Sequence, residues 1–172
     1  MSKFLIVVDM QKDFITGCLG SSQAQAVVPH IKEKINSFDG NVIFTMDTHN
    51  EDYLNTQEGK KLPVKHCIKN TPGWEIIDEL KPYAVNCIEK PTFGSKQLTH
   101  MLSQINEKEP IEAIELVGVC TSICVISNAM LLKAYLPETP ICVIADLCAC
   151  VSKESHNAAL IAMETAQIEI VR

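Results

Sequence analysis

The chain has 172 residues, 47% of them hydrophobic, and carries a formal net charge of −6. This length suits one domain over residues 1–172, and the apolar content excludes disorder as the main state because burial can offset chain entropy. Apolar runs such as 4–8 hold about five residues, far below the ~20 that a membrane-spanning helix needs. The acidic balance, without a Lys- or Arg-rich stretch, argues against a nucleic-acid partner.

Short apolar runs rich in β-branched residues alternate with stretches of helical periodicity. The expected elements, in chain order, are strand 4–8, helix 27–38, strand 41–46, helix 74–80, strand 85–88, helix 95–106, strand 111–119, helix 122–135, strand 140–145, helix 152–165 and strand 168–171. Ser95 and Ser152 are expected to cap their helices. Continuous apolar strands alternating with helices predict an α/β fold, a parallel sheet covered on both faces in three layers.

Residues 49–72 show no convincing period. A loop of that length in a compact domain usually has a function.

Cysteine is abundant, with eight residues in the chain. In a short secreted domain an even count suggests disulfides, but this chain is longer and shows no secretory signal. Several cysteines lie in apolar runs, among them Cys87 and Cys142. We therefore expect reduced core thiols in a cytoplasmic protein.

Chemically active residues follow the predicted strands, where ligands bind in open parallel sheets. Asp9 comes directly after five apolar residues, so partial desolvation would raise its pKa toward the range of a general base. Lys90 follows the third strand; beside a thiolate and a carboxylate it would hold charge and orient them, and otherwise it is a surface lysine.

Cys124 lies in the first turn of a predicted helix, where the helix dipole favours a thiolate. We predict that it is a nucleophile, with Cys148 and Cys150 as positional alternatives that lack so clear a helix start. Cys120 lies in the preceding turn; its thiol is expected to fill space, whereas its backbone N–H could face an oxyanion.

Asp47 and His49 are two residues apart at a strand end, so both side chains can point to one side. Glu58 and His66 follow in the irregular loop. Imidazoles with carboxylates suit Zn²⁺, Fe²⁺ or Mn²⁺ with an open position. The alternative is that Asp47 and His49 only hydrogen-bond and brace the loop.

Three aromatic residues, Phe14, Phe93 and Trp74, also follow strands and could form an apolar wall for a flat substrate. Trp74 could equally belong to the core.

Taken together, these blocks resemble the isochorismatase-like cysteine hydrolases, a superfamily that includes nicotinamidase/pyrazinamidase. The matching blocks run in family order over nearly the whole chain: Val8 to Phe14, Asp47 to His49, His66 and Cys67 with Thr71 to Gly73, Lys90 to Phe93, and Gly118 to Cys124. The resemblance implies a six-stranded parallel sheet in the order 3-2-1-4-5-6 and a homo-oligomer.

The resemblance further implies a catalytic triad of Asp9, Lys90 and Cys124 that cleaves a carboxamide through a thioester on Cys124. The implied oxyanion hole comprises the backbone N–H groups of Cys120 and Cys124, and the implied peptide between Val119 and Cys120 is cis. The metal positions correspond to Asp47, His49, Glu58 and His66, and the metal would coordinate the pyridine nitrogen of nicotinamide.

Hydrolysis of nicotinamide to nicotinate and ammonia is therefore the favoured function. Ser122 stands where nicotinamidases usually carry Asp. Two alternatives stay open: hydrolysis of another small amide, such as a ureido or carbamoyl compound, and a non-catalytic thiol or metal sensor. The acid and base at Asp9 and Lys90 favour an enzyme, because a sensor needs only a reactive thiol. The residue type at Cys124 argues against a true isochorismatase, which cleaves a vinyl ether without a cysteine.

Overall fold

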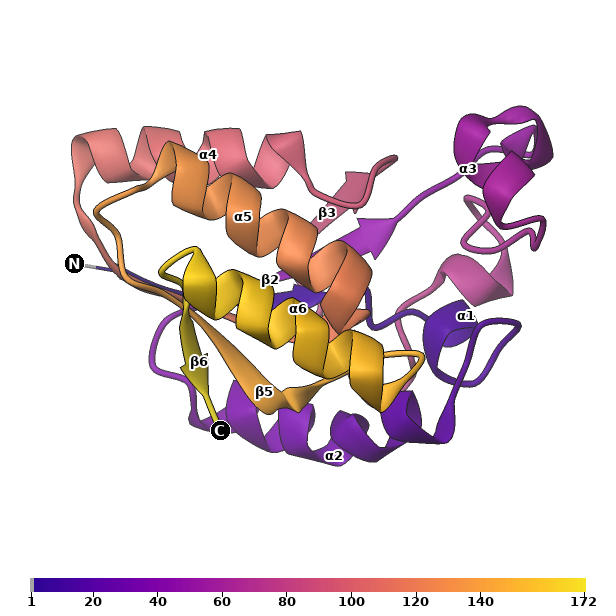
Figure 1. The fold of residues 1–172 in the computed structure, drawn as a ribbon, viewed down its shortest axis with the longest axis horizontal. Coiled ribbons are helices and arrows are strands. Elements are labelled where there is room, and N and C mark those ends of the chain that lie inside the picture. Colours follow the sequence, from indigo (N-terminus) through magenta and orange to yellow (C-terminus); the bar gives the residue numbers. More distant parts are fainter. Residues whose placement is uncertain (1) are drawn as a thin grey trace.

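The computed structural model describes residues 2–172 and contains one six-stranded parallel sheet (Figure 1). The strand order is β3-β2-β1-β4-β5-β6, as the resemblance implied. The strands span Ser2–Val8 (β1), Asn41–Asp47 (β2), Cys87–Lys90 (β3), Ile111–Val119 (β4), Ile141–Ala149 (β5) and Glu169–Val171 (β6). The chain order reverses between β1 and β4, so their carboxyl ends form the topological switch point at which such folds bind ligands.

Helices cover both faces of the sheet, which confirms the predicted three-layer α/β architecture. In Figure 1, α4, α5 and α6 lie side by side over one face, and α2 crosses the other. The helices are α1 (Lys12–Ile15), α2 (Ser22–Ser37), α3 (Gln57–Lys61), α4 (Lys96–Lys108), α5 (Ile126–Tyr135) and α6 (Lys153–Thr165).

Strand β1 is apolar from Phe4 to Val8 because this part contributes to a core on each face. Phe4, Ile6 and Val8 pack with α4, α5 and α6, whereas Leu5 and Val7 pack with α2. Successive side chains of a strand point to opposite faces, so a doubly covered strand needs an unbroken apolar run. Such a run at residues 4–8 is the observation that predicted a buried strand.

Serine side chains cap three of the helices. The hydroxyls of Ser95 and Ser152 accept hydrogen bonds from Leu98 N and Ser155 N, as expected for capping residues. Ser21 caps α2 in the same way, so this helix begins at Ser22, five residues before the predicted start at 27.

The predicted helix over 74–80 is wrong. A short 3₁₀ helix, η2 (Pro72–Trp74), ends there, and Ile76 forms an antiparallel bridge with Gln11. Ile77 then donates its backbone N–H to Met10 O at 3.1 Å. The apolar residues of this segment are buried against the α2 face as their spacing indicated, but hydrogen bonds to the chain after β1 replace helical ones.

The segment 49–72 follows β2 and is partly ordered into helical turns. It contains η1 (Tyr53–Asn55) and α3, which lies beyond the carboxyl end of β2 in Figure 1. His49 forms a parallel bridge with Ile68, and its N–H donates to Cys67 O at 2.9 Å. The loop is thereby folded back over the edge of the sheet where the site residues lie.

Within residues 2–172, no helix combines the length and apolar character needed to cross a membrane.

Candidate active site

The three residues of the predicted triad meet at the carboxyl edge of the sheet. Asp9 follows β1, Lys90 ends β3, and Cys124 lies in a π-helical turn, η4 (Thr121–Val125), that precedes α5. Lys90 Nζ lies 2.7 Å from Asp9 Oδ2 and 3.4 Å from Cys124 Sγ. All three side chains are buried, so they interact with little screening by solvent.

The close approach of β1 and β4 brings Asp9 near Cys124. Val8 pairs with Gly118, and a Cβ added to Gly118 would lie 2.2 Å from Val8 O. Gly118 also has φ +116°, a backbone conformation that residues other than glycine rarely adopt. The peptide between Val119 and Cys120 is cis, as the resemblance implied.

The Asp9 carboxylate is held by two neighbours. Its Oδ1 accepts a hydrogen bond from Thr45 Oγ1 at 2.6 Å, and its Oδ2 forms the ion pair with Lys90 without accepting an aligned hydrogen bond. Burial raises the pKa of Asp9 although Lys90 opposes the effect, and the nearby Asp47 raises it further. Asp9 is therefore a better proton acceptor than a solvent-exposed aspartate.

Lys90 and Cys124 respond to the same environment in different ways. Burial would lower the pKa of Lys90, but the charges of Asp9, Cys124 and Asp47 outweigh burial and raise it. Burial and Asp9 raise the pKa of the Cys124 thiol, and Lys90 only partly offsets them. The free site therefore holds a protonated thiol beside a permanent cation and a basic carboxylate.

Asn128 fixes the turn that carries Cys124. Its Nδ2 donates to Cys124 O at 2.8 Å and to Phe93 O at 3.2 Å, and its Oδ1 accepts from Ser95 N at 2.9 Å. One fully buried amide thus ties the turn that bears Cys124 to the segment after Lys90. Sequence analysis did not identify this residue, because a polar position inside an amphipathic helix pattern carries no sign of its partners.

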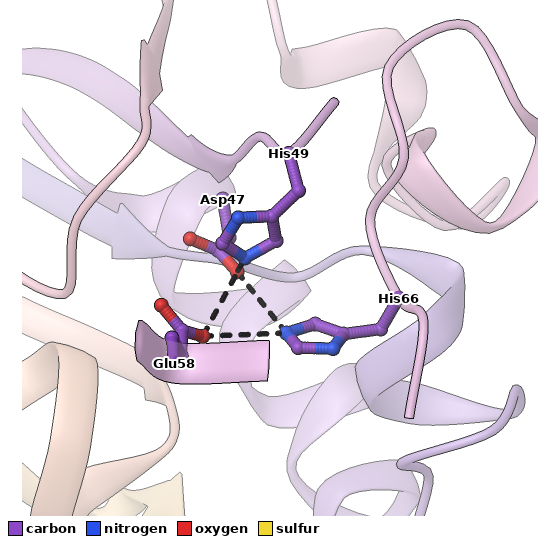
Figure 2. Close-up of side chains that lie close together, drawn as sticks. All are labelled: Asp47, His49, Glu58 and His66. Atoms are coloured by element: carbon purple, nitrogen blue, oxygen red, sulfur yellow. Dashed lines mark hydrogen bonds and ion pairs between the residues drawn. The ribbon is translucent and has the colours of Figure 1, made fainter. Parts of the chain in front are cut away.

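A second group of side chains, Asp47, His49, Glu58 and His66, lies beside the triad (Figure 2). One ligand atom from each lies within 4.8 Å of all the others. Asp47 Oδ2 is 2.9 Å from His49 Nε2 and 3.5 Å from His66 Nε2, and Lys90 Nζ is 3.4 Å from Asp47 Oδ1. All four predicted metal positions are therefore brought together and connected to the triad through Lys90.

The surroundings of this group fit a divalent cation. His66 Nδ1 donates to Val64 O at 2.8 Å, a bond that leaves the Nε2 lone pair directed at Asp47 and Glu58. Burial would lower the pKa of His66, but Asp47 and the bond to Val64 O raise it overall, because a proton on Nε2 would supply the positive charge that the carboxylates attract. A cation would satisfy both carboxylates and both imidazoles at once.

Sequence analysis did not identify Tyr53 as part of this region. Its ring packs against His49 at a centroid distance of 4.6 Å and against His66 at 4.9 Å, and its hydroxyl donates to Leu62 O at 3.0 Å. It therefore restrains both imidazoles. The hydrogen bond of 2.9 Å between Asp47 and His49 also matches the alternative in which this pair braces the loop.

A cavity of about 400 Å³ opens beside Cys124, the one triad residue that lines it. Phe14 and Phe93 line it together with Cys124, Asp47 and His66. Trp74 is not among the lining residues; its indole Nε1 donates to Thr48 Oγ1 at 2.9 Å and its ring packs against the α2-side core. The expected aromatic wall thus has two of its three members at the cavity, because the segment of Trp74 pairs with the chain after β1.

Most of the remaining wall comes from residues without a sequence signal. These are small or apolar side chains: Leu19, Gly20, Ser21, Ala24, Leu62, Val119, Ile123, Ala149 and Val151. Glu58, Cys120 and Cys150, which the sequence analysis singled out, complete the lining. The cavity is therefore mostly apolar. Its charged groups come from Asp47, Glu58 and His66, and its other polar side chains are Ser21 and the thiols of Cys120, Cys124 and Cys150.

Comparison with known proteins identifies the family. A family model of the isochorismatase domain matches residues 3–172. The chain belongs to the isochorismatase family.

Individual relatives agree with this assignment. An isochorismatase family protein of Bacillus subtilis strain 168 is 30% identical over 93% of each chain. The nicotinamidase of Schizosaccharomyces pombe is 27% identical, over 97% of this chain and 91% of its own. The crystal structure of the pyrazinamidase of Pyrococcus horikoshii in complex with zinc superposes with a TM-score of 0.85 at 26% identity, over 100% of this chain and 99% of that one.

Proposed function

We propose that this isochorismatase family member is a cysteine amidohydrolase that converts nicotinamide to nicotinate and ammonia. The observation that carries the proposal is the buried contact of Lys90 with both Asp9 and Cys124 beneath the cavity. The nicotinamidase of S. pombe and the pyrazinamidase of P. horikoshii support an amide of an aromatic nitrogen ring as the substrate.

In the first half of the proposed reaction, Asp9 accepts the proton of the Cys124 thiol, and Sγ forms a bond to the carboxamide carbon. Lys90 stabilises the negative charge as it moves from sulfur to the carbonyl oxygen. When the carbonyl re-forms, the C–N bond breaks, and Asp9 returns the proton to the departing nitrogen as ammonia leaves. The raised pKa of Asp9 suits both transfers.

In the second half, water replaces ammonia. Asp9 removes a proton from the water while the water oxygen attacks the thioester carbon. The C–S bond then breaks, and Asp9 passes the proton to Sγ. The product acid leaves and the thiol is regenerated. We propose that two backbone N–H groups stabilise the oxyanion in both halves of the reaction. They belong to Cys120, which directly precedes η4, and to Cys124 within it.

We further propose that Asp47, His49, Glu58 and His66 hold a divalent ion, with zinc, iron or manganese as candidates. When bound, the ion supplies a Lewis-acidic centre that orients a ring nitrogen of the substrate. Phe14 and Phe93 are proposed to contact the faces of the ring, since both line the cavity. The family resemblance favours a homo-oligomer, which light scattering would detect.

Ammonia release from purified, metal-loaded enzyme tests the proposal. The panel contains nicotinamide, benzamide, which lacks the ring nitrogen, and a carbamoyl amino acid. Ammonia should be released from nicotinamide much faster than from the other two compounds. Cys124→Ala should lower kcat on the order of 10⁴-fold or more. Cys142→Ser is the matched control, because Cys142 lies in β5 outside the cavity and its loss should leave the rate within about twofold.

Other outcomes would separate the alternatives. Hydrolysis of only the carbamoyl compound, still dependent on Cys124, would contradict the nicotinamide assignment and leave the amidohydrolase mechanism. Absence of ammonia release from every amide would contradict the enzyme proposal and favour a thiol or metal sensor.

A further inference from the structure

Besides Cys124, the cavity wall contains a pair of neighbouring thiols. The Sγ atoms of Cys120 and Cys150 are 3.0 Å apart, and Ser122 Oγ lies 3.0 Å from Cys150 Sγ. Both cysteines line the cavity, so a small solute that enters it can reach them. The proposed amidase reaction uses neither side chain.

The sheet register holds these two residues opposite one another. Val119 and Ala149 are paired residues of the neighbouring strands β4 and β5, and each cysteine follows its strand directly. Paired residues of adjacent strands are separated by about 4.8 Å, which lies within the Cα range of disulfides. The two sulfur atoms need to approach by only about 1 Å to reach bonding distance.

The local environment makes the two thiols unequal. Burial would raise the pKa of Cys150, but hydrogen bonds from the Cys120 thiol, from the Ser122 hydroxyl and from the backbone N–H groups of Ser122 and Val151 outweigh it and lower the pKa. Burial and the same contact raise the pKa of Cys120 to about 11. A cavity-lining thiol with a lowered pKa beside a second thiol is the arrangement found in redox-active cysteine pairs.

We propose that Cys120 and Cys150 form a peroxide-reactive dithiol in the cavity wall that closes to a disulfide, chemically separate from Cys124. The thiolate of Cys150 attacks one oxygen of hydrogen peroxide; the O–O bond breaks, sulfur is oxidised to a sulfenic acid, and the other oxygen leaves as water after protonation. The sulfur of Cys120 then attacks the sulfenic sulfur, its proton passes to the departing hydroxyl, and a second water leaves. Two thiols and one peroxide thus give one disulfide and two waters.

Cys124 is expected to react more slowly. Its pKa is raised by burial and by Asp9, so little thiolate is available to attack an oxidant. The dithiol proposal does not depend on the amidase proposal, because its product is read by mass and needs no substrate.

Peptide mapping tests the proposal directly. The reduced, full-length protein receives one equivalent of hydrogen peroxide, free thiols are blocked with N-ethylmaleimide, and the unreduced protein is digested with trypsin. The expected product joins peptides 109–133 and 134–153, and its mass is two hydrogens lower than the sum of the two peptides with these thiols free. Fragmentation should locate the bond at Cys120 and Cys150, and dithiothreitol should abolish it.

Two variants complete the design. Cys150→Ser should lose the linked species, whereas Cys142→Ser, which keeps the same peptide, should form it as the wild type does. The wild-type digest alone decides the outcome if Cys150→Ser does not fold. A bond that contains Cys124, Cys142 or Cys148, oxidation of Cys124 before the link appears, or no link at all would overturn the proposal.

Discussion

At the scale of single residues, the site depends on one buried cation shared by several anions. Lys90 Nζ contacts Asp9 and Asp47 and lies 3.4 Å from Cys124 Sγ. Buried charges of this kind persist only when they are paired, because removing one partner leaves the other without compensation. Replacing any one member of the proposed triad is therefore expected to remove most of the activity that replacing several of them would remove.

Non-additivity of substitutions tests this dependence. Asp9→Asn should lower kcat by about 10³-fold or more, because the thiol then lacks a proton acceptor. The double variant Asp9→Asn/Cys124→Ala should be no less active than Cys124→Ala alone, since both residues serve one step. Steady-state ammonia release checks the rates, and circular dichroism checks that each variant folds. Losses that multiply would contradict the shared role.

The pH dependence of the reaction tests the carboxylate itself. Burial raises the pKa of Asp9 above its ordinary value of 3.8, against the opposing effect of Lys90. The value of kcat/KM should therefore fall as the pH drops through this raised pKa, because protonated Asp9 cannot accept the thiol proton.

Thr45→Val provides the matched variant for the pH profile. Thr45 Oγ1 donates to Asp9 Oδ1, and this hydrogen bond lowers the pKa of Asp9. Its loss should move the acid limb of kcat/KM to higher pH. If the acid limb does not move in Thr45→Val, it reflects the titration of a group other than Asp9.

At the scale of elements, the site depends on how closely β1 and β4 approach. Gly118 in β4 lies against Val8 at the end of β1, and the turn bearing Cys124 begins three residues later. Asp9, the next residue after Val8, adopts φ +50°, which turns the chain out of the sheet toward α1. The distance between acid and thiol is thus set by two backbone positions and not by side-chain choice alone.

A methyl group at Gly118 would test this dependence. Gly118→Ala should reduce the free energy of unfolding by about 3 kcal/mol or more, because the new Cβ meets backbone atoms of Val8 and φ is positive. Gly94→Ala is the control, since its closest contact is the flexible end of Leu131, which can rotate away. Urea unfolding measures both, and equal losses would contradict the argument.

At the scale of the whole molecule, the four-ligand group connects the sheet edge with the long segment that follows it. Asp47 ends β2, Glu58 belongs to α3, and His66 lies beyond it. A ligand that binds only the folded chain stabilises it by mass action, by about 2.7 kcal/mol at a hundred times its Kd. A bound ion should therefore raise the stability of the entire fold.

Thermal unfolding with and without chelator measures this gain. The Tm of wild-type protein should fall when a chelator removes the ion and recover with added Zn²⁺. His49→Ala should lose this response. His30→Ala, at an exposed position of α2, should respond as the wild type does. A Tm that is indifferent to chelator, in protein containing less than about a tenth of an equivalent of metal, would favour the bracing alternative.

The sequence by itself determined the layers of the fold and the residues at the strand ends. Unbroken apolar runs such as 4–8 report burial on both faces, and this property is local. The strand order and the cis peptide came from the family resemblance, which the blocks from Asp9 to Cys124 carried. The prediction of the layers succeeded because it depends on residues close together in the chain.

Only the tertiary structure decided which segments meet. The contacts of Lys90 with Cys124, of Tyr53 with His66, and of Cys120 with Cys150 all join residues that are remote in sequence. The helix predicted over 74–80 was wrong for the same reason, because hydrogen bonds to the chain after β1 outweighed its local helical spacing. Periodicity records what a segment buries, whereas its partners are fixed by sheet register and by the close approach that residues such as Gly118 allow.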